Sequence, residues 1–130
     1  MYCRSIALEN YRNIEKEKIA FDPGVNVLFG DNAQGKTNVL EAIYSFARGK
    51  SFRNATDREI ATLGKNEYFS ELEFFANARA QKLSTRYYEG SKIRLHNGIK
   101  IDRLFDMIGR FRAVFFCPEH LALVKGGAGE

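Results

Sequence analysis

Apolar and polar residues alternate along the first stretch of the chain, over residues 2–9 and again over residues 16–21. A period of two places successive side chains on opposite faces, so each stretch predicts a half-buried strand. The continuous apolar run over residues 25–29 predicts a buried third strand. From Lys36 to Arg48 the apolar positions recur with helical spacing, and Gly49 follows where a helix C-terminus favours glycine. The opening pattern is therefore three strands and a helix.

The second half of the chain has a mainly β-like pattern. Residues 56–63 begin with the spacing of a capping box and predict a short helix. Residues 67–101 then read as a run of antiparallel strands, within which Asn97-Gly98 is a strong signal for a two-residue hairpin turn. Residues 102–108 predict another short helix, and residues 113–116 predict a buried strand.

These elements describe one α/β domain rather than two. With 130 residues, of which 45% are hydrophobic, the chain is long enough for one packed core and lacks the composition of a disordered segment. We divide it into a core over residues 1–66, an antiparallel β insertion over residues 67–101, and a return to the core over residues 102–130. In that last part a final helix is predicted to begin at Pro118.

A glycine-rich loop lies between the third strand and the long helix, and its sequence GDNAQGKT matches the phosphate-binding pattern G-x-x-x-x-G-K-[ST]. Gly30 and Gly35 permit the tight backbone wrap that turns N–H groups toward phosphate, and Lys36 brings a positive charge. The Thr37 hydroxyl is a suitable ligand for Mg²⁺. The expected nucleotide-binding residues here are Gly30, Asp31, Asn32, Ala33, Gln34, Gly35, Lys36, Thr37 and Asn38, the last with a structural role as its alternative. Because a strand precedes the loop and a helix follows it, we predict that the chain binds ATP or GTP.

Charge is unevenly distributed, although the net charge is only +4. Residues 77–112 carry nine Lys and Arg against three Asp and Glu, whereas the rest of the chain is slightly acidic. A basic segment suits DNA, because phosphate contacts release counterions, and Arg86 and Arg94 are its candidate contacts. A solvated sheet face is the alternative, which the charge count alone slightly favours. No apolar run approaches the length that spans a bilayer, so no membrane segment is expected.

Four ordered blocks of the sequence are distinctive as a set, namely LENYRN over residues 8–13, PGVNVLFGDNAQGKTNVLEAIY over residues 23–44, GKSFR over residues 49–53, and VFFCPEHLALVKGG over residues 114–127. Together these blocks resemble the RecF family of bacterial DNA-repair ATPases. Two strands precede the strand of the phosphate loop, as in ATPase heads of the ABC and SMC type. The resemblance therefore implies an α/β P-loop NTPase of that type, with an antiparallel β insertion.

The resemblance also implies a function larger than this stretch of sequence. Proteins of the family bind ATP, dimerise head to head around two nucleotides, bind DNA, and hydrolyse ATP slowly with stimulation by DNA. With RecO and RecR they help to place RecA on gapped DNA in the bacterial cytoplasm. In the family the Walker B carboxylates and the signature motif follow the region that corresponds to this chain. We therefore expect a partial ATPase domain that binds nucleotide weakly and hydrolyses it poorly or not at all.

Residues outside the phosphate loop receive roles from the same resemblance. Arg12 and Asn13 correspond to positions that approach the nucleotide, although an exposed strand-end pair is the alternative. Glu119 falls where related ATPases carry the glutamine of the Q-loop, and it either contacts the metal through water or is a solvated residue of a first helical turn. Lys50 and Arg53 are candidates for DNA or for the nucleotide of an opposing subunit, with plain surface charges as the alternative.

Two other functions stay open at this point. A head fragment of another SMC-like DNA-repair ATPase would share the first two blocks, and a heptad run after the head would indicate it, but none occurs before residue 130. A DNA- or protein-binding module with a non-catalytic phosphate loop is the second alternative. Substitution of Lys36 would then leave an electrostatic DNA contact intact, whereas it would abolish nucleotide binding.

Overall fold

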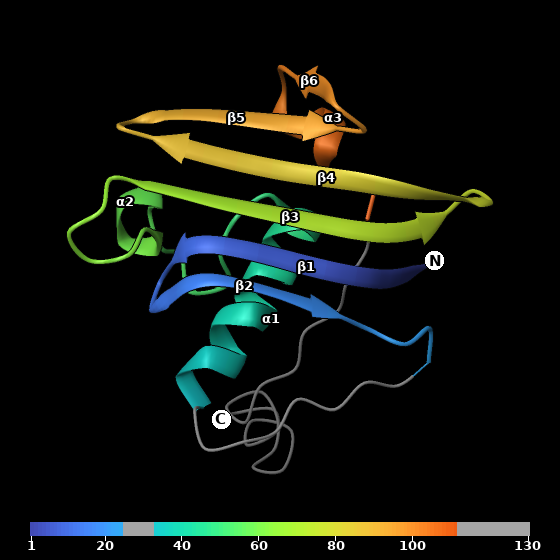
Figure 1. The fold of residues 1–130 in the computed structure, drawn as a ribbon. Helices are drawn as coiled ribbons and strands as arrows, with labels where there is room; N and C mark the ends of the chain where they lie inside the picture. The colour runs from blue at the N-terminus through green and yellow to red at the C-terminus, as the bar shows by residue number, and fades with distance from the viewer. Residues whose placement is uncertain (25–32, 112–130) are drawn as a thin grey trace, which may run out of the picture.

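The computed structural model describes residues 1–24 and 33–111, with the backbone alone for residues 33, 34 and 105. Six strands form one antiparallel sheet in the order β2-β1-β3-β4-β5-β6 (Figure 1). The strands are β1 Tyr2–Tyr11, β2 Ile14–Ala20, β3 Glu67–Ala76, β4 Arg79–Tyr88, β5 Ser91–His96 and β6 Ile99–Ile101. The helices are α1 Ala33–Arg48, α2 Asp57–Ile60 and α3 Leu104–Met107.

The sheet is continuous from the N-terminal hairpin to β6. β1 pairs with β2 on one side and with β3 on the other, so the strands within residues 67–101 extend the sheet that the first hairpin begins. β3, β4, β5 and β6 then follow as successive antiparallel neighbours. The segment between β2 and β3 contains α1 and α2, so the predicted phosphate loop ends where α1 begins.

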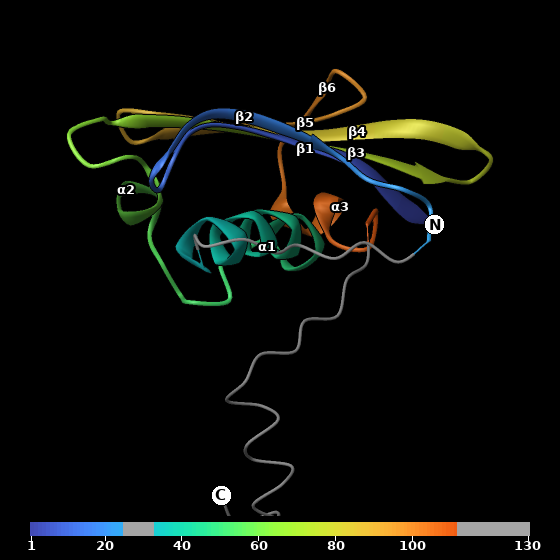
Figure 2. The ribbon, with the colours of Figure 1, turned by 60° about the horizontal axis from the view of Figure 1, so that its bottom comes forward.

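All three helices lie against one face of the sheet, and the other face carries no helix among the described residues (Figure 2). The antiparallel strands predicted within residues 67–101 are confirmed, and in β3 every second side chain is buried on the helix side. Leu72 is 0% exposed at the centre of that face, directly opposite Ile6 of β1 and Leu83 of β4. The core therefore lies between this face of the sheet and the helices that cover it, as in other two-layer domains.

α1 begins at Ala33, three residues before the predicted start, and it ends at the predicted Arg48. Its buried side chains include Val39, Ala42 and Phe46, which repeat with helical spacing and cover the sheet. Gly49 follows with a φ of +79°, a left-handed conformation that a side chain would strain. A Cβ atom there would also lie 2.7 Å from Leu104 Cδ1, so glycine allows α3 to approach the end of α1.

α2 is shorter than the helix predicted over residues 56–63. The capping box at its start is confirmed, since the Thr56 side chain accepts a hydrogen bond from the Glu59 N–H and the Glu59 carboxylate accepts one from the Thr56 N–H. The helix ends early because the next residues bond to the end of β1. The Thr62 N–H donates to the Asn10 carbonyl at 2.8 Å, which competes with continued helical bonding.

The remaining predictions of secondary structure have mixed outcomes. The hairpin turn at Asn97-Gly98 is confirmed, with φ values of 52° and 84° that suit asparagine and glycine. The short helix predicted over residues 102–108 is present as the four residues of α3. The strands predicted over residues 25–29 and 113–116, and the last predicted helix, lie outside the described residues.

Candidate nucleotide site

α1 carries the second half of the predicted phosphate loop. Gly35, Lys36 and Thr37 are partly buried in its first turn. The other loop residues lie outside the described residues or are described by their backbone alone, namely Gly30, Asp31, Asn32, Ala33 and Gln34. A helix N-terminus has unpaired N–H groups and a partial positive charge, so this end of α1 suits phosphate oxygens.

The hairpin between β1 and β2 turns at Arg12 and Asn13, the two residues predicted to approach the nucleotide. The register of the strands leaves only these two residues for the turn, and Arg12 has a φ of 55°, which is unusual for arginine. Contacts with the end of α2 hold this conformation. The Arg12 N–H donates to the Ile60 carbonyl at 2.6 Å, and the Thr62 hydroxyl donates to the Arg12 carbonyl at 2.7 Å.

Beside this turn lies Glu41, a carboxylate of α1 that is 0% exposed. Arg12 donates to it twice, from Nε to Oε1 at 3.0 Å and from Nη2 to Oε2 at 2.7 Å. The Ser51 hydroxyl donates to Oε2 at 2.5 Å, and the Tyr11 hydroxyl donates to Oε1 at 3.4 Å. Arg53 Nε lies 3.7 Å from Oε2. A buried carboxylate without partners would be strongly unfavourable, so these contacts are what allow a charge at this depth.

The protonation states follow from these contacts. Burial alone would raise the pKa of Glu41, but the hydrogen bonds from Arg12 and Ser51 and the charges of Arg12 and Arg53 outweigh it and hold the pKa below its ordinary value. The hydrogen bond to Glu41 raises the pKa of Arg12. Burial and the nearby carboxylate raise the pKa of the Tyr11 hydroxyl well above its ordinary value. At neutral pH the carboxylate and the guanidinium are therefore charged and the tyrosine is a neutral donor.

A second series of hydrogen bonds connects the hairpin turn to the first turns of α1. Asn38, which directly follows Thr37, donates from Nδ2 to Asn13 Oδ1 at 2.7 Å. It accepts at Oδ1 from Arg53 Nη2 at 3.0 Å. The structure thus brings together Arg12, Asn13 and Asn38, which were all predicted to bind nucleotide. It adds Arg53, which was predicted to contact DNA or the nucleotide of an opposing subunit.

These side chains line a cavity of about 830 Å³ between the hairpin turn and the loop after α2. Small-molecule sites occupy roughly 300–1,000 Å³, so the cavity is large enough for a nucleotide or a substantial part of one. The lining residues are Arg12, Asn13, Asn38, Arg53, Arg58, Glu59, Ala61, Thr62, Leu63, Gly64, Lys65 and Asn66. Four of them are cationic and one is anionic, so the cavity favours a negatively charged ligand.

Sequence reasoning missed the loop over residues 61–66 and the role of Glu41. Leu63 in that loop is 99% exposed, but no signal in the sequence marked this loop, because single apolar residues are common on protein surfaces. Glu41 gave no such signal, because glutamate in a helix is ordinarily exposed and only the tertiary structure buries this one.

The other predicted DNA contacts lie on opposite faces of the sheet. Arg86 is exposed on the bare face, where its guanidinium lies 4.6 Å from the centre of the Phe69 ring. Arg94 belongs to the helix-covered face, because it pairs in register with the buried Thr85. Together with Lys50 it lines a second cavity, of about 340 Å³, between the sheet and the ends of α1 and α2.

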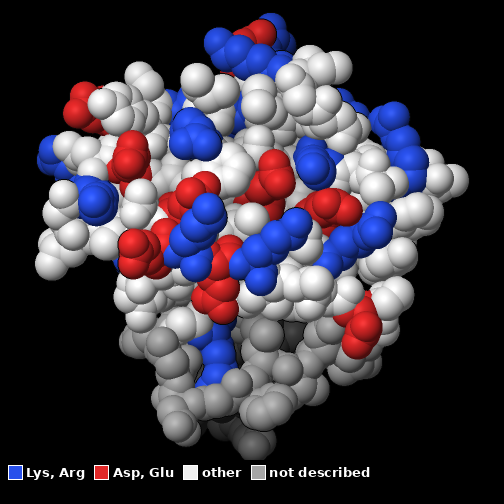
Figure 3. Space-filling view, viewed as in Figure 1, with Lys and Arg blue, Asp and Glu red and all other residues white. Residues whose placement is uncertain are grey.

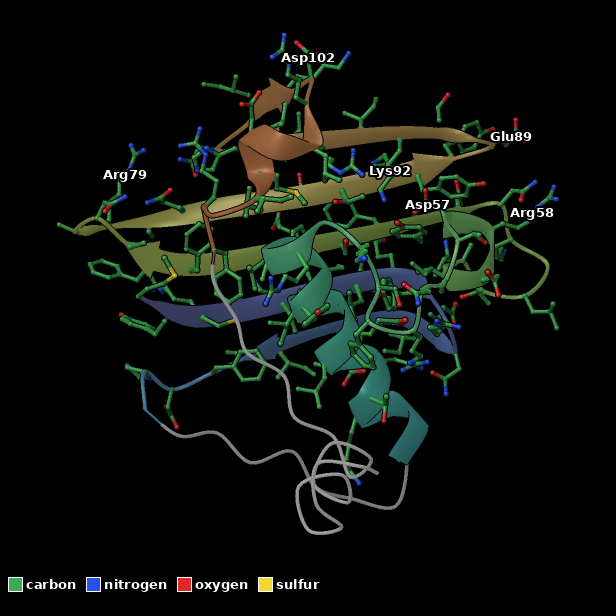
Figure 4. The ribbon with its side chains drawn as sticks, turned by 180° about the vertical axis from the view of Figure 1, so that it is seen from behind. Asp57, Arg58, Arg79, Glu89, Lys92 and Asp102 are labelled. Carbon is green, nitrogen blue, oxygen red and sulfur yellow. The ribbon has the colours of Figure 1, made fainter. Side chains whose placement is uncertain are left out.

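The bare face carries both signs of charge, with Lys and Arg among Asp and Glu (Figure 3). Glu73 of β3, for example, is directly opposite Lys82 of β4. On the helix-covered face Lys92 and Asp57 point toward each other (Figure 4), with 2.9 Å between Nζ and Oδ1. Glu119, the candidate for a water-mediated metal contact, lies outside the described residues.

Comparison with known protein families assigns this arrangement of sheet and helices to an ATPase domain. Residues 1–106 match the family model described as AAA ATPase domain, and the chain belongs to this family. Within the described residues no helix combines the length and apolar character needed to cross a membrane.

Curated proteins that are similar to the chain include RecF proteins. The DNA replication and repair protein RecF of Desulfitobacterium hafniense (strain DSM 10664 / DCB-2) is 37% identical over 130 residues, which cover 100% of this chain and 36% of that protein. The protein of the same name from Geobacillus thermodenitrificans (strain NG80-2) is 42% identical over 129 residues, which cover 97% of this chain and 34% of that protein. The chain therefore spans about a third of the length of these relatives, and the resemblance to RecF is confirmed.

Solved structures agree with this relationship. The structure of the recombination mediator protein RecF-ATPrS in the RecFOR pathway matches with a TM-score of 0.86 and 33% identity, covering 95% of this chain and 34% of that one. The SMC head domain from Thermotoga maritima matches with a TM-score of 0.66 and 22% identity, covering 85% of this chain and 42% of that one. This likeness shows the fold alone. The predicted fold class, an ABC/SMC-type ATPase head present in part, is confirmed.

Proposed function

We propose that the 830 Å³ cavity is part of an ATP site whose phosphate end lies at the N-terminus of α1. The observation that carries this proposal is the convergence of Arg12, Asn13 and Asn38 beside the helix that follows the phosphate loop. These residues come from a hairpin and a helix that are separated in sequence. A chance match to the loop motif would not bring such residues together, whereas a binding site requires it.

Each residue has a distinct role in this proposal. Lys36 neutralises the β- and γ-phosphate oxygens, and the glycines of the loop let its N–H groups approach them. The donors present suit Mg²⁺, since the Thr37 hydroxyl is a hard oxygen ligand and this cation takes most of its other ligands from phosphate and water. Glu119 remains a candidate for contact with that metal through water. Leu63 offers an exposed apolar surface against which the base can pack.

We extend the proposal to the whole protein from its relatives. It is a slow, DNA-stimulated ATPase of DNA replication and repair in the bacterial cytoplasm, which dimerises around ATP and acts with RecR and RecO to load RecA at gapped DNA. The names of the RecF relatives and of the structure from the RecFOR pathway support this proposal. The stretch described here is expected to bind nucleotide without appreciable turnover, because its sequence contains no apolar strand that ends in an acidic pair.

Binding of ATP with Mg²⁺ by the full-length protein, followed by titration calorimetry, tests the nucleotide site. We expect the Lys36→Ala variant to lose at least about tenfold in affinity, because a charge-assisted contact to phosphate disappears. Lys18→Ala is the matched control, since Lys18 is exposed on β2, away from the cavity. Equal affinity of the parent protein and Lys36→Ala for ATP would refute the proposed site. Rapid ATP hydrolysis by residues 1–130 alone would refute the expectation that catalytic carboxylates are missing from this stretch.

A further inference from the structure

Glu41 lies behind the wall of the cavity rather than in it. It is 0% exposed and does not line the cavity, yet two residues that do line it, Arg12 and Arg53, both contact its carboxylate. It is one helical turn beyond Thr37, and residues four apart share a helix face. The carboxylate is thus fixed on α1 in line with the expected phosphate and metal end of the site.

Each of the two arginines lines the cavity and uses only part of its donors within the described part of the chain. Arg12 uses Nε and Nη2 for Glu41, and Arg53 directs Nε toward Glu41 and Nη2 toward Asn38. A guanidinium has five N–H donors, of which these contacts use only some. The Nη1 groups of both residues have no hydrogen-bond partner within the described part of the chain. The side chains are 21% and 27% exposed, which leaves them accessible to a ligand but restricted in direction.

Arg53 is held close to the expected phosphate end by two short connections. Its backbone N–H donates to the Ser51 hydroxyl oxygen at 3.0 Å, and that hydroxyl in turn donates to Glu41. Its side chain donates to Asn38, the residue after Thr37. The guanidinium is therefore within hydrogen-bonding distance of the first turns of α1, where the phosphate loop ends.

We infer that Glu41 is a positioning residue that presents Arg12 and Arg53 to the phosphates of the bound nucleotide. This inference rests on the proposed function, and it moves Arg53 from the DNA candidates to the nucleotide site of its own chain. One carboxylate between two guanidiniums screens their mutual repulsion and still leaves a net positive charge at the cavity. Without the carboxylate the two cations would repel each other and turn toward solvent.

A purely structural role of Glu41 predicts a different result. Glu41 would then only hold the hairpin turn against α1, so its replacement would lower the stability of the protein and weaken the binding of all nucleotides equally. If Glu41 positions the arginines, its effect depends on their contacts with phosphate. Its replacement then weakens the binding of ATP more than that of ADP, and the binding of ADP more than that of AMP. The dependence of affinity on the number of phosphates therefore separates the two roles, independently of any change in stability.

The experiment compares Kd values for ATP, ADP and AMP by titration calorimetry, on the full-length protein and its Glu41→Gln, Arg53→Ala and Arg53→Lys variants. Circular dichroism confirms that each variant is folded. We expect Arg53→Ala to weaken ATP about tenfold and AMP little, as loss of one charge-assisted contact predicts. Glu41→Gln should show the same order of losses, with a smaller additional effect in the Arg53→Ala background because the two residues share one interaction. Lysine at position 53 should restore part of the ATP affinity.

Equal losses for the three nucleotides, or an Arg53→Ala variant that loses DNA affinity while ATP affinity is unchanged, would overturn the inference. The proposed nucleotide site would survive that result if Lys36→Ala still abolished ATP binding, whereas a parent protein that does not bind ATP would overturn both. If Glu41→Gln fails to fold, Glu41→Asp replaces it, because it keeps the charge but withdraws it by one methylene. The same graded loss is then expected at smaller size, and the Arg53 variants decide the outcome if neither Glu41 variant folds.

Discussion

Leu72 at the centre of the buried sheet face offers a quantitative test of the core. It is 0% exposed, and its neighbours across the strands, Ile6 and Leu83, are 1% and 0% exposed. A buried Leu→Ala change costs about 2–5 kcal/mol, depending on how far the surroundings collapse into the gap. Both neighbours are held in hydrogen-bonded strands, so collapse is limited. We therefore expect Leu72→Ala to cost about 3–5 kcal/mol, within the upper part of that range.

Leu63→Ala is the matched control, because it makes the same chemical change where the side chain is 99% exposed. Its effect should stay within about 0.5 kcal/mol. Urea unfolding followed by far-UV circular dichroism gives the free energy of unfolding of both variants and of the parent protein, all with the same chain length. With a slope of about 2 kcal/mol per molar urea, the Leu72 variant should lower the midpoint by about 2 M. A cost below about 1 kcal/mol for Leu72→Ala, or equal costs at the two positions, would refute the assignment of this face as the core.

The remaining predictions concern three local features. The pKa of Glu41 lies below its ordinary value of 4.5, so its stabilising contribution is present above that value and is lost as the pH falls through the lower folded value. Unfolding free energy should therefore fall more steeply with acid in the parent protein than in Glu41→Gln, and parallel pH profiles in urea unfolding would contradict this. Tyr68→Phe removes a hydroxyl that donates to Asp57 at 2.7 Å, while Lys92 still pairs with the carboxylate, so thermal unfolding should show a loss of about 1 kcal/mol rather than none. Gly98→Ala places a side chain at a φ of +84°, which costs about 1 kcal/mol, and amide exchange in β5 and β6 should quicken; unchanged exchange would count against the strained turn.

Periodicity predicted most of the described fold because burial on one face follows directly from the period of the sequence. β3 buries every second residue, and α1 ends at Arg48 as its apolar spacing and the following glycine predicted. The C-terminal end of α2 could not be predicted in the same way. Its predicted continuation toward Leu63 is prevented by the hydrogen bond from the Thr62 N–H to the Asn10 carbonyl of β1, and such a contact depends on a strand more than forty residues away.

The candidate site divides in the same manner between local and long-range information. Lys36 and Thr37 follow from a motif whose spacing alone carries the chemistry. The convergence of Asn13 with Asn38 needs the sheet to form first, and the resemblance to RecF gave the only earlier indication of it. Glu41 lies one helical turn beyond the motif, but its sequence position does not distinguish a buried carboxylate from a solvated one. Its two arginine partners supply that information only in the folded chain.

The basic character of residues 77–112 shows why charge counted along a chain differs from charge presented on a surface. Alternation within the strands sends Arg86 to the bare face and Arg94 to the helix-covered face. On the bare face the cations of β4 stand beside the acidic side chains of β3, as Lys82 does beside Glu73, so no uniformly basic surface results (Figure 3). A surface that follows a phosphate backbone needs cations without such neighbours. On the helix-covered face, by contrast, Arg94 shares a cavity with Lys50. Of the two candidates within this segment, Arg94 is therefore better placed than Arg86 for the predicted DNA contact.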